Sequence, residues 1–142
     1  MSSKLLNRRH RLVRVRSAQH AQAVAETVRA QEEAKSIESN RQRLQRVRAE
    51  LFKSNISQIG HEFASYRELA DRLERAGKQL EGALYDAHKV IGEKQGRQVE
   101  ANRDKEIAQR LKERVHAQIE EQREARIAAI PRYRSIQSGE PE

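Results

Sequence analysis

Histidines, cysteines and clustered carboxylates are the residues that most often do chemistry in proteins, and here they form no catalytic or metal-binding arrangement. The chain of 142 residues has no cysteine, which excludes disulfides, redox pairs and thiolate metal sites. No two histidines stand three or four residues apart, the spacing that places two ligands on one helical face. We therefore expect no catalytic residue, no metal and no cofactor. The five histidines are His10, His20, His61, His88 and His116.

Two short sequences begin like known motifs and then depart from them. His61-Glu62 opens like a zinc-protease helix, but Ser65 stands where the second histidine is required. Gly77-Lys78 lacks both the earlier glycine and the following Ser or Thr of a phosphate-binding loop. A pair of long helices also offers no concave pocket of the size that a substrate needs. We therefore predict a protein that is not an enzyme and has no small-molecule substrate.

Positive charge is concentrated at the N-terminal end of the chain. Lys and Arg number 29 against 21 Asp and Glu, a net charge of +8, and the whole excess lies in residues 1–54. Residues 55–142 contain sixteen of each sign and are neutral. Such an end attracts negative surfaces over about a Debye length, ~8–10 Å. The basic residues that precede the first acid, Glu26, are Lys4, Arg8, Arg9, Arg11, Arg14 and Arg16.

Three interpretations of this basic end stay open. It is a solvated helix terminus, a docking site for an acidic protein surface or a phosphate backbone, or an Arg-rich targeting peptide. Against targeting, the segment continues into the following helical pattern with no boundary resembling a cleavage site. Against nucleic acid, the second half of the chain is neutral, and no aromatic residue near the cluster could stack on bases.

The basic end begins a long helical pattern. No proline precedes Pro131 and no glycine precedes Gly60, so the strongest helix breakers are missing from the first arm. Turn-forming residues cluster only at 54–60. A narrow apolar stripe, typical of a coiled-coil seam, runs along the first arm. Its members are Val24, Val28, Ile37, Leu44, Val47 and Leu51.

The second arm carries a sustained heptad, which weakens between Gly92 and Arg103. Gly92 and Gly96 lower helix stability there by about 1 kcal/mol each relative to Ala. We interpret this stretch either as a hinge or as a change of register in a continuous helix. The seam resumes at Ile107 or Ala108 and continues with Leu111, Val115 and Ile119. The heptad positions before the weak stretch are Tyr66, Leu69, Leu73, Ala76, Leu80, Ala83, Ala87 and Val90.

Together these patterns predict an all-α fold, a long rod formed by an antiparallel two-helix coiled-coil hairpin over residues 1–130. The first arm covers about 4–54, the bend about 55–60 and the second arm about 61–130; residues 131–142 form a flexible tail. At 1.5 Å per residue the arms are roughly 75 Å and 105 Å long, so the second overhangs the first. The basic end then packs beside Ala101–Val115, and Phe52, Phe63 and Tyr66 close the tip.

No apolar stretch approaches the ~20 residues that a membrane span requires. We therefore expect a soluble and cytoplasmic protein.

Several segments resemble the FliJ/YscO family, the coiled-coil stalk proteins of flagellar and injectisome type III export. The first arm starts with Leu12-Val13-Arg14-Val15-Arg16 and ends with a Leu44, Val47-Arg48, Leu51 pattern. The run from Tyr66 to Ala76, Tyr-Arg-Glu-Leu-Ala-Asp-Arg-Leu-Glu-Arg-Ala, is similar to the opening of the family's second helix. The chain departs from the family at Pro131, which ends the helix where the family often carries a charged helical extension.

The resemblance implies a non-catalytic component of the export apparatus, held at the inner-membrane face by its partners. The paired ends of the hairpin would enter a hexameric export ATPase, and the middle would contact the cytoplasmic domain of the export gate and the export chaperones. By motif position, the gate-contacting face would be Tyr66, Leu69, Leu73, Ala76 and Leu80. Of these we expect Leu69 and Leu73 in the seam, with Tyr66 and Leu80 partly exposed.

No sequence motif indicates which residues would dock in the ring of the hexameric ATPase. By charge and geometry we assign ring docking to Arg8, Arg9, Arg11, Arg14 and Arg16. The alternatives are a generic coiled-coil adaptor or scaffold whose seam is intermolecular, and a basic rod that binds nucleic acid. Whether the chain serves a flagellum or an injectisome stays open.

Overall fold

The computed structural model describes residues 2–54 and 61–130, which form two long helices, α1 (Ser2–Ser54) and α2 (His61–Ala129). These bounds lie within two residues of the expected arms. The expected bend at 55–60 and the tail at 131–142 lie outside the described residues. Chains rich in Ala, Gln, Glu, Arg and Leu favour helix throughout, and no strand occurs in either described range.

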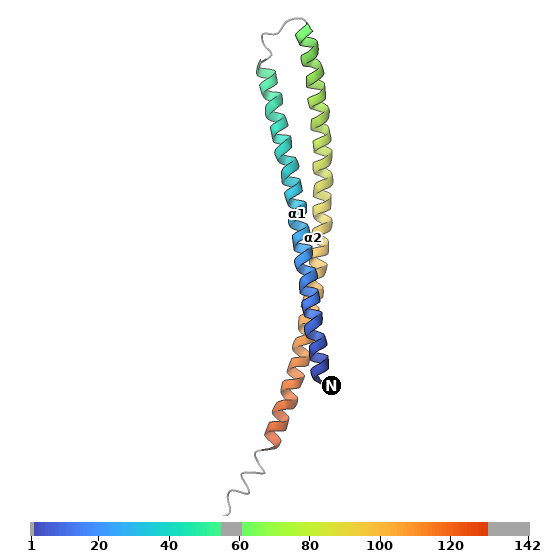
Figure 1. The fold of residues 1–142 in the computed structure, drawn as a ribbon, viewed down its shortest axis with the longest axis vertical. Coiled ribbons are helices and arrows are strands. Elements are labelled where there is room, and N and C mark those ends of the chain that lie inside the picture. Colours follow the sequence, from blue (N-terminus) through green and yellow to red (C-terminus); the bar gives the residue numbers. More distant parts are fainter. Residues whose placement is uncertain (1, 55–60, 131–142) are drawn as a thin grey trace, which may run out of the picture. The chain divides into compact units, whose positions relative to one another are not determined.

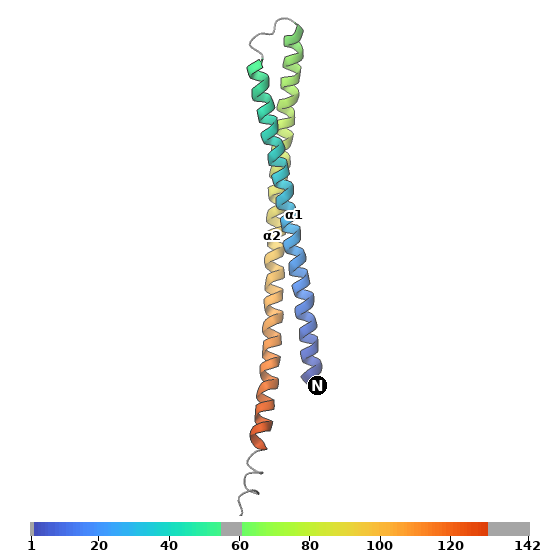
Figure 2. The ribbon, with the colours of Figure 1, turned by 60° about the vertical axis from the view of Figure 1, so that its left-hand side comes forward.

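The chain divides into two compact units. The terminal unit consists of Met1–Ala21 and Val99–Glu142, and the central unit is Gln22–Gln98. Within each unit a segment of α1 packs against a segment of α2 that runs in the opposite direction (Figures 1 and 2). The predicted all-α fold of two antiparallel packed helices is therefore confirmed.

A set of buried and half-buried positions of α1 recurs at alternating intervals of three and four residues, as in a coiled-coil seam. The residues flanking this set that are also half-buried are Leu12, Ser17, Val24, Glu26 and Glu38. In the terminal unit they are Leu6, Arg9, Val13, Arg16 and His20. In the central unit they are Ala23, Thr27, Ala30, Ala34, Ile37, Arg41, Leu44, Arg48 and Leu51.

The seam of α2 has the same rhythm. Its positions in the central unit are Tyr66, Ala70, Leu73, Gly77, Leu80, Leu84, Ala87, Ile91, Lys94 and Gln98. Those in the terminal unit are Ala101, Lys105, Ala108, Lys112, Val115 and Ile119.

Small residues bring the two helices of the central unit close together. Ala30 and Ala34 are each only 6% exposed, and a methyl group placed on Gly77 would lie 3.5 Å from Leu44 Cδ2. Counting outward from this Leu44–Gly77 pair in opposite directions along the helices places Ile37 opposite Leu84. Thr27 is also buried, and its Oγ1 donates a hydrogen bond to the carbonyl oxygen of Ala23 at 3.0 Å.

Every second seam position of α2 lies one residue later than the sequence predicts. The expected positions were Leu69, Ala76, Ala83 and Val90, whereas Ala70, Gly77, Leu84 and Ile91 are half-buried in the structure; of the expected four only Ala76 is half-buried as well. Leu69 is 44% exposed and Val90 is 39% exposed. The positions shared by both readings recur every seven residues, and a heptad can be completed either three or four residues onward. The close contact between Gly77 and Leu44 of α1 selects the register in which the next seam residue follows four positions onward.

The expected stripe of α1 needs a similar correction. Val28 and Val47 are exposed and lie outside the seam. Arg41, which is not among the apolar residues of the stripe, is itself a half-buried seam residue. A long basic side chain can occupy such a position because its methylene groups pack while its charge reaches the surface. The Nη1 of Arg41 lies 3.7 Å from Glu38 Oε2.

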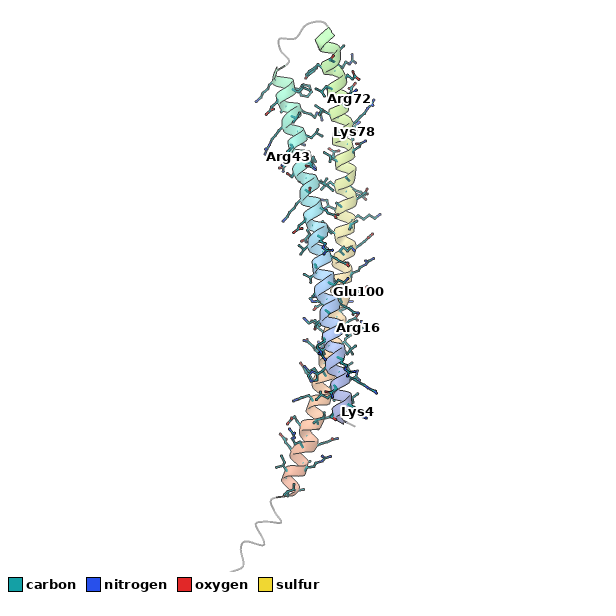
Figure 3. The ribbon with its side chains drawn as sticks, viewed as in Figure 1. Lys4, Arg16, Arg43, Arg72, Lys78 and Glu100 are labelled. Atoms are coloured by element: carbon teal, nitrogen blue, oxygen red, sulfur yellow. The ribbon has the colours of Figure 1, made fainter. Side chains whose placement is uncertain are left out.

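The outer faces of the helices are charged. Arg72 pairs with Glu68 at 3.0 Å and Lys78 with Glu74 at 4.0 Å, one helical turn apart. Arg43, Arg72 and Lys78 project outward from the ribbons in Figure 3. Such exposed pairs stabilise a helix by only about 0.3–0.5 kcal/mol each.

The predicted weak stretch from Gly92 to Arg103 lies in one continuous α-helix. Both Gly92 and Gly96 are exposed, and a methyl group added to either would meet no heavy atom within 4 Å. We therefore expect Gly92→Ala and Gly96→Ala to raise the free energy of unfolding by about 1 kcal/mol each. Urea unfolding followed by circular dichroism tests this. A double variant no more stable than the parent would contradict a helix in this stretch.

In the terminal unit the apolar core is thin. Ala108 is 1% exposed and Val115 is 8% exposed, and these are its only buried apolar side chains among residues 3–21 and 99–130. From residue 121 to 130 every side chain is exposed, because α2 continues past the start of α1, as predicted (Figure 1). Neither described helix is apolar enough over a sufficient length to cross a membrane.

Candidate docking surfaces

The structure divides the five arginines assigned to docking into two groups. Arg8, Arg11 and Arg14 are exposed, whereas Arg9 and Arg16 occupy seam positions. The assignment of all five to docking stays a prediction; α2 partly covers Arg9 and Arg16 and leaves Arg8, Arg11 and Arg14 exposed. Over Ser2–Ala21 the helix has six basic residues and no acidic one, so the three exposed arginines form a strongly positive face. The end of this segment is marked by Lys4 in Figure 3.

Arg16 is engaged within the terminal unit. Its Nη1 lies 3.5 Å from Asp104 Oδ2 on α2 and donates a hydrogen bond to Gln19 Oε1 at 3.1 Å. The Arg16–Asp104 pair confirms the prediction that the basic end packs beside Ala101–Val115. It also establishes the register of this unit, with Arg16 opposite residues 104 and 105.

An open groove of about 440 Å³ runs along the basic face of the terminal unit. Val13 supplies the apolar part of its wall, and Lys112 contributes a second helix's positive charge. A smaller hollow beside it is lined by Lys4, Asn7, Arg8 and Arg11. The groove is therefore cationic with an apolar patch, which favours a ligand that has both carboxylates or phosphates and some apolar surface. The residues lining it are Asn7, His10, Arg11, Val13, Arg14 and Lys112.

Sequence reasoning missed the role of Lys105 and Lys112. Both stand at seam positions of α2, seven residues apart, yet a search for apolar stripes passes over basic residues. The signal that could have identified them is their spacing from Ala101, Ala108 and Val115, which continues the heptad without a break.

The gate-contacting face expected from the motif is also divided. Tyr66, Leu73, Leu80 and Ala76 are half-buried, and only Leu69 is exposed. The expectation that Leu69 belongs to the seam was therefore wrong, and Leu73 is correctly placed. Leu69 joins a second stripe at seven-residue spacing that flanks the seam, formed by Leu69, Ala76, Ala83 and Val90.

The aromatic residues near the end of the central unit behave partly as predicted. The rings of Phe52 and Tyr66 meet edge to face, with centroids 6.2 Å apart. Such a pair contributes about 0.5–1.5 kcal/mol beyond its buried area. Phe63 is 53% exposed and Phe52 is 55% exposed, so this end of the unit presents aromatic surface.

The central unit has an open groove of about 530 Å³, whereas we expected two helices to offer no concave pocket of the size that a substrate needs. Its apolar part is formed by Ala34, Leu84 and Ile91, and His88 stands at its edge. Within residues 3–53 and 63–130 no three His, Asp or Glu side chains lie close enough to hold a metal ion. The other residues lining the groove are Gln31, Lys35 and Glu38.

These features define a class of protein, an all-α antiparallel coiled coil with a basic terminal unit. No family model, curated protein or solved structure matches the chain. The resemblance to the FliJ/YscO family therefore stays a prediction.

Proposed function

We propose that the chain is a non-enzymatic stalk of a type III protein export apparatus, flagellar or injectisome, acting in the cytoplasm at the inner-membrane face. Its terminal unit docks in the central hole of a hexameric export ATPase, and its central unit contacts the export gate and the chaperones that deliver substrates. The antiparallel helical pairing and the Tyr66–Ala76 run support this proposal.

The observation that carries the proposal is the unbalanced charge of the terminal unit. No acid accompanies the six basic residues of Ser2–Ala21, and the α2 segment beside them, residues 99–129, contains seven basic and seven acidic residues. The neighbouring helix therefore leaves the excess charge in place, and long-range attraction guides this end to a negative surface. We assign the docking contacts to Arg8, Arg11 and Arg14, which are exposed.

We propose that the export gate contacts the stripe that flanks the seam, and not the whole face expected from the motif. The residues of this stripe are Leu69, Ala76, Ala83 and Val90. Leu69 and Val90 are exposed apolar side chains, and Ala83 between them is exposed as well. A stripe at seven-residue spacing beside the seam is the surface that a third helix can pack against. Tyr66, Leu73 and Leu80 support this stripe from within the seam.

The proposed function is tested by adding the purified chain to its cognate export ATPase and measuring ATP hydrolysis and the population of hexamers. We expect both to rise. The triple variant Arg8→Glu, Arg11→Glu, Arg14→Glu should lose most of the stimulation, about tenfold, because reversing charge at a steering surface chiefly lowers the association rate. Its helicity by circular dichroism should not change.

A matched control carries the same charge change on the central unit. Arg29, Arg43 and Arg46 are exposed residues of α1, and changing all three to Glu should leave the stimulation within about twofold of the parent. Equal loss in both triple variants would show that only net charge matters. No stimulation by the parent chain would refute the stalk function.

A coiled-coil adaptor or scaffold is the second candidate. The exposed apolar residues Ile107, Ile127 and Ile130 of α2 favour it, since they leave an apolar surface for another chain. Light-scattering mass separates the two functions, because a stalk is expected to be monomeric and a self-assembling scaffold is not. Nucleic-acid binding would appear as an affinity that falls steeply with salt.

A further inference from the structure

The seam of the terminal unit places positive charge opposite positive charge. With Arg16 opposite residues 104 and 105 through its ion pair with Asp104, Arg16 and Lys105 share a layer. Seven residues outward on each helix, Arg9 and Lys112 share the next such layer, and Val13 and Ala108 lie between them. Like charges directly opposite each other are destabilising, so a further negative charge near these two layers would stabilise them.

The central unit has basic seam residues too, but none faces another base. Counting from the Leu44–Gly77 pair places Arg41 opposite Leu80 and Arg48 opposite Leu73. Lys94 is neutralised by Glu26, whose Oε2 lies 3.2 Å from its Nζ. The like-charge layers are therefore a property of the terminal unit.

The terminal unit's own acids do not neutralise both layers. Asp104 forms an ion pair with Arg16. Glu106 and Glu113 directly follow Lys105 and Lys112, so they point about 100° away around the helix, and both are exposed. Within residues 3–53 and 63–130 no carboxylate forms an ion pair with Arg9 or Lys112. The Nε of Arg9 is buried without a hydrogen-bond partner, as is the Nε of Arg41 in the central unit. An unsatisfied buried donor of this kind is costly.

The cationic groove reaches this layer at Lys112, whereas Arg9 does not line it. Lys112 lines it together with Val13, and Arg11 and Arg14 form part of its walls. Seven residues of helix rise about 10.5 Å, so Arg9 and Arg16 repeat at the spacing of acids in successive heptads of another helix. The apolar patch of Val13 between them suits the apolar residue of the same heptad.

We propose that the terminal unit binds an acidic amphipathic helix of a protein partner. One carboxylate of that helix pairs with the Arg9–Lys112 layer and a second, seven residues along, with the Arg16–Lys105 layer, while an apolar side chain between them packs on Val13. The inference goes beyond the export function and does not depend on it, because it rests on the charges of these two layers alone.

The test uses the full chain and a fluorescent helical peptide of about 21 residues, three heptads long, with Glu at one position of each heptad and Leu beside it. We expect saturable binding measured by fluorescence anisotropy. A second peptide has the same composition with its Glu residues moved off the seven-residue spacing, and we expect it to bind about tenfold more weakly. Equal affinity of the two peptides would overturn the proposed pairing of layers.

The variant Arg9→Gln, Lys112→Gln should weaken binding of the first peptide by about tenfold or more, since it removes one charge-paired layer. It relieves repulsion in the seam, so it is expected to fold. The control Arg41→Gln, Arg48→Gln removes the same charge from the central unit and should change affinity by less than about twofold. Equal weakening by both variants would refute a site in the terminal unit.

Inorganic polyphosphate serves as the competing anion. We expect it to displace the peptide poorly at physiological salt, because it has no apolar residue to pack on Val13. If polyphosphate binds more tightly than the peptide and the Arg9→Gln, Lys112→Gln variant weakens it equally, the groove is a phosphate site and the proposed protein helix is wrong.

Discussion

Leu84→Asp will lower the free energy of unfolding by about 3 kcal/mol or more, and Ala83→Asp will lower it by only about 0.5 kcal/mol. Leu84 is a seam residue opposite Ile37 and lines the apolar groove of the central unit. An aspartate there loses the apolar contacts and brings an unpaired charge between the helices. Ala83 is exposed, so its substitution costs little beyond helix propensity.

The two variants are a matched pair, since they introduce the same side chain at adjacent positions of one helix. Urea unfolding of both, followed by circular dichroism at 222 nm, gives their free energies and m-values. Equal destabilisation would contradict the register described for α2. A larger effect at Ala83 would restore the register that completes the heptad through Leu69 and Ala76.

Replacing both members of the Arg9–Lys112 layer with leucine will stabilise the terminal unit by about 2 kcal/mol. Each leucine adds about 1 kcal/mol of half-buried apolar contact, and the double change also removes like-charge repulsion. The gain should differ from the sum of the single variants, because the two sites face each other and either single change already ends the repulsion. Hydrogen exchange is the measurement of choice, since it reports the stability of this unit separately.

Salt provides an independent check on the same layer. Screening weakens repulsion, so raising NaCl should increase amide protection in the parent's terminal unit, and this increase should be smaller in the double-leucine variant. Arg43→Leu, at an exposed position of α1, controls for the general effect of removing an arginine. A parent whose protection in this unit falls as salt rises would show that attraction dominates the layer.

The double-leucine variant connects stability with binding. If the basic layers exist to receive an acidic helix, the stabilised variant should bind the acidic peptide at least tenfold more weakly than the parent. A stabilising substitution that costs binding is the usual sign of a surface kept for interaction. If the variant is more stable and binds the acidic peptide as tightly as the parent, these layers have no role in docking.

The candidate site was only partly predictable from sequence. The excess of positive charge at the N-terminal end is a matter of composition, and Arg8, Arg11 and Arg14 are exposed as a docking surface requires. Arg9 and Arg16 could not be separated from them, because all five share one short segment. Their heptad phase becomes meaningful only when a second helix lies beside them.

The sequence by itself determined that the described chain is two helices with a narrow seam. Helix propensity, the absence of proline before Pro131 and the turn-forming cluster at 54–60 are local properties, and a repeat of three and four residues needs no partner to be recognised. Only the tertiary structure decided which side of that repeat is buried. Ala83 and Leu84 are both apolar neighbours, and so are Val90 and Ile91. The choice between them depends on how closely the facing helix can approach, and that depends on small residues such as Ala34 and Gly77 on both helices at once.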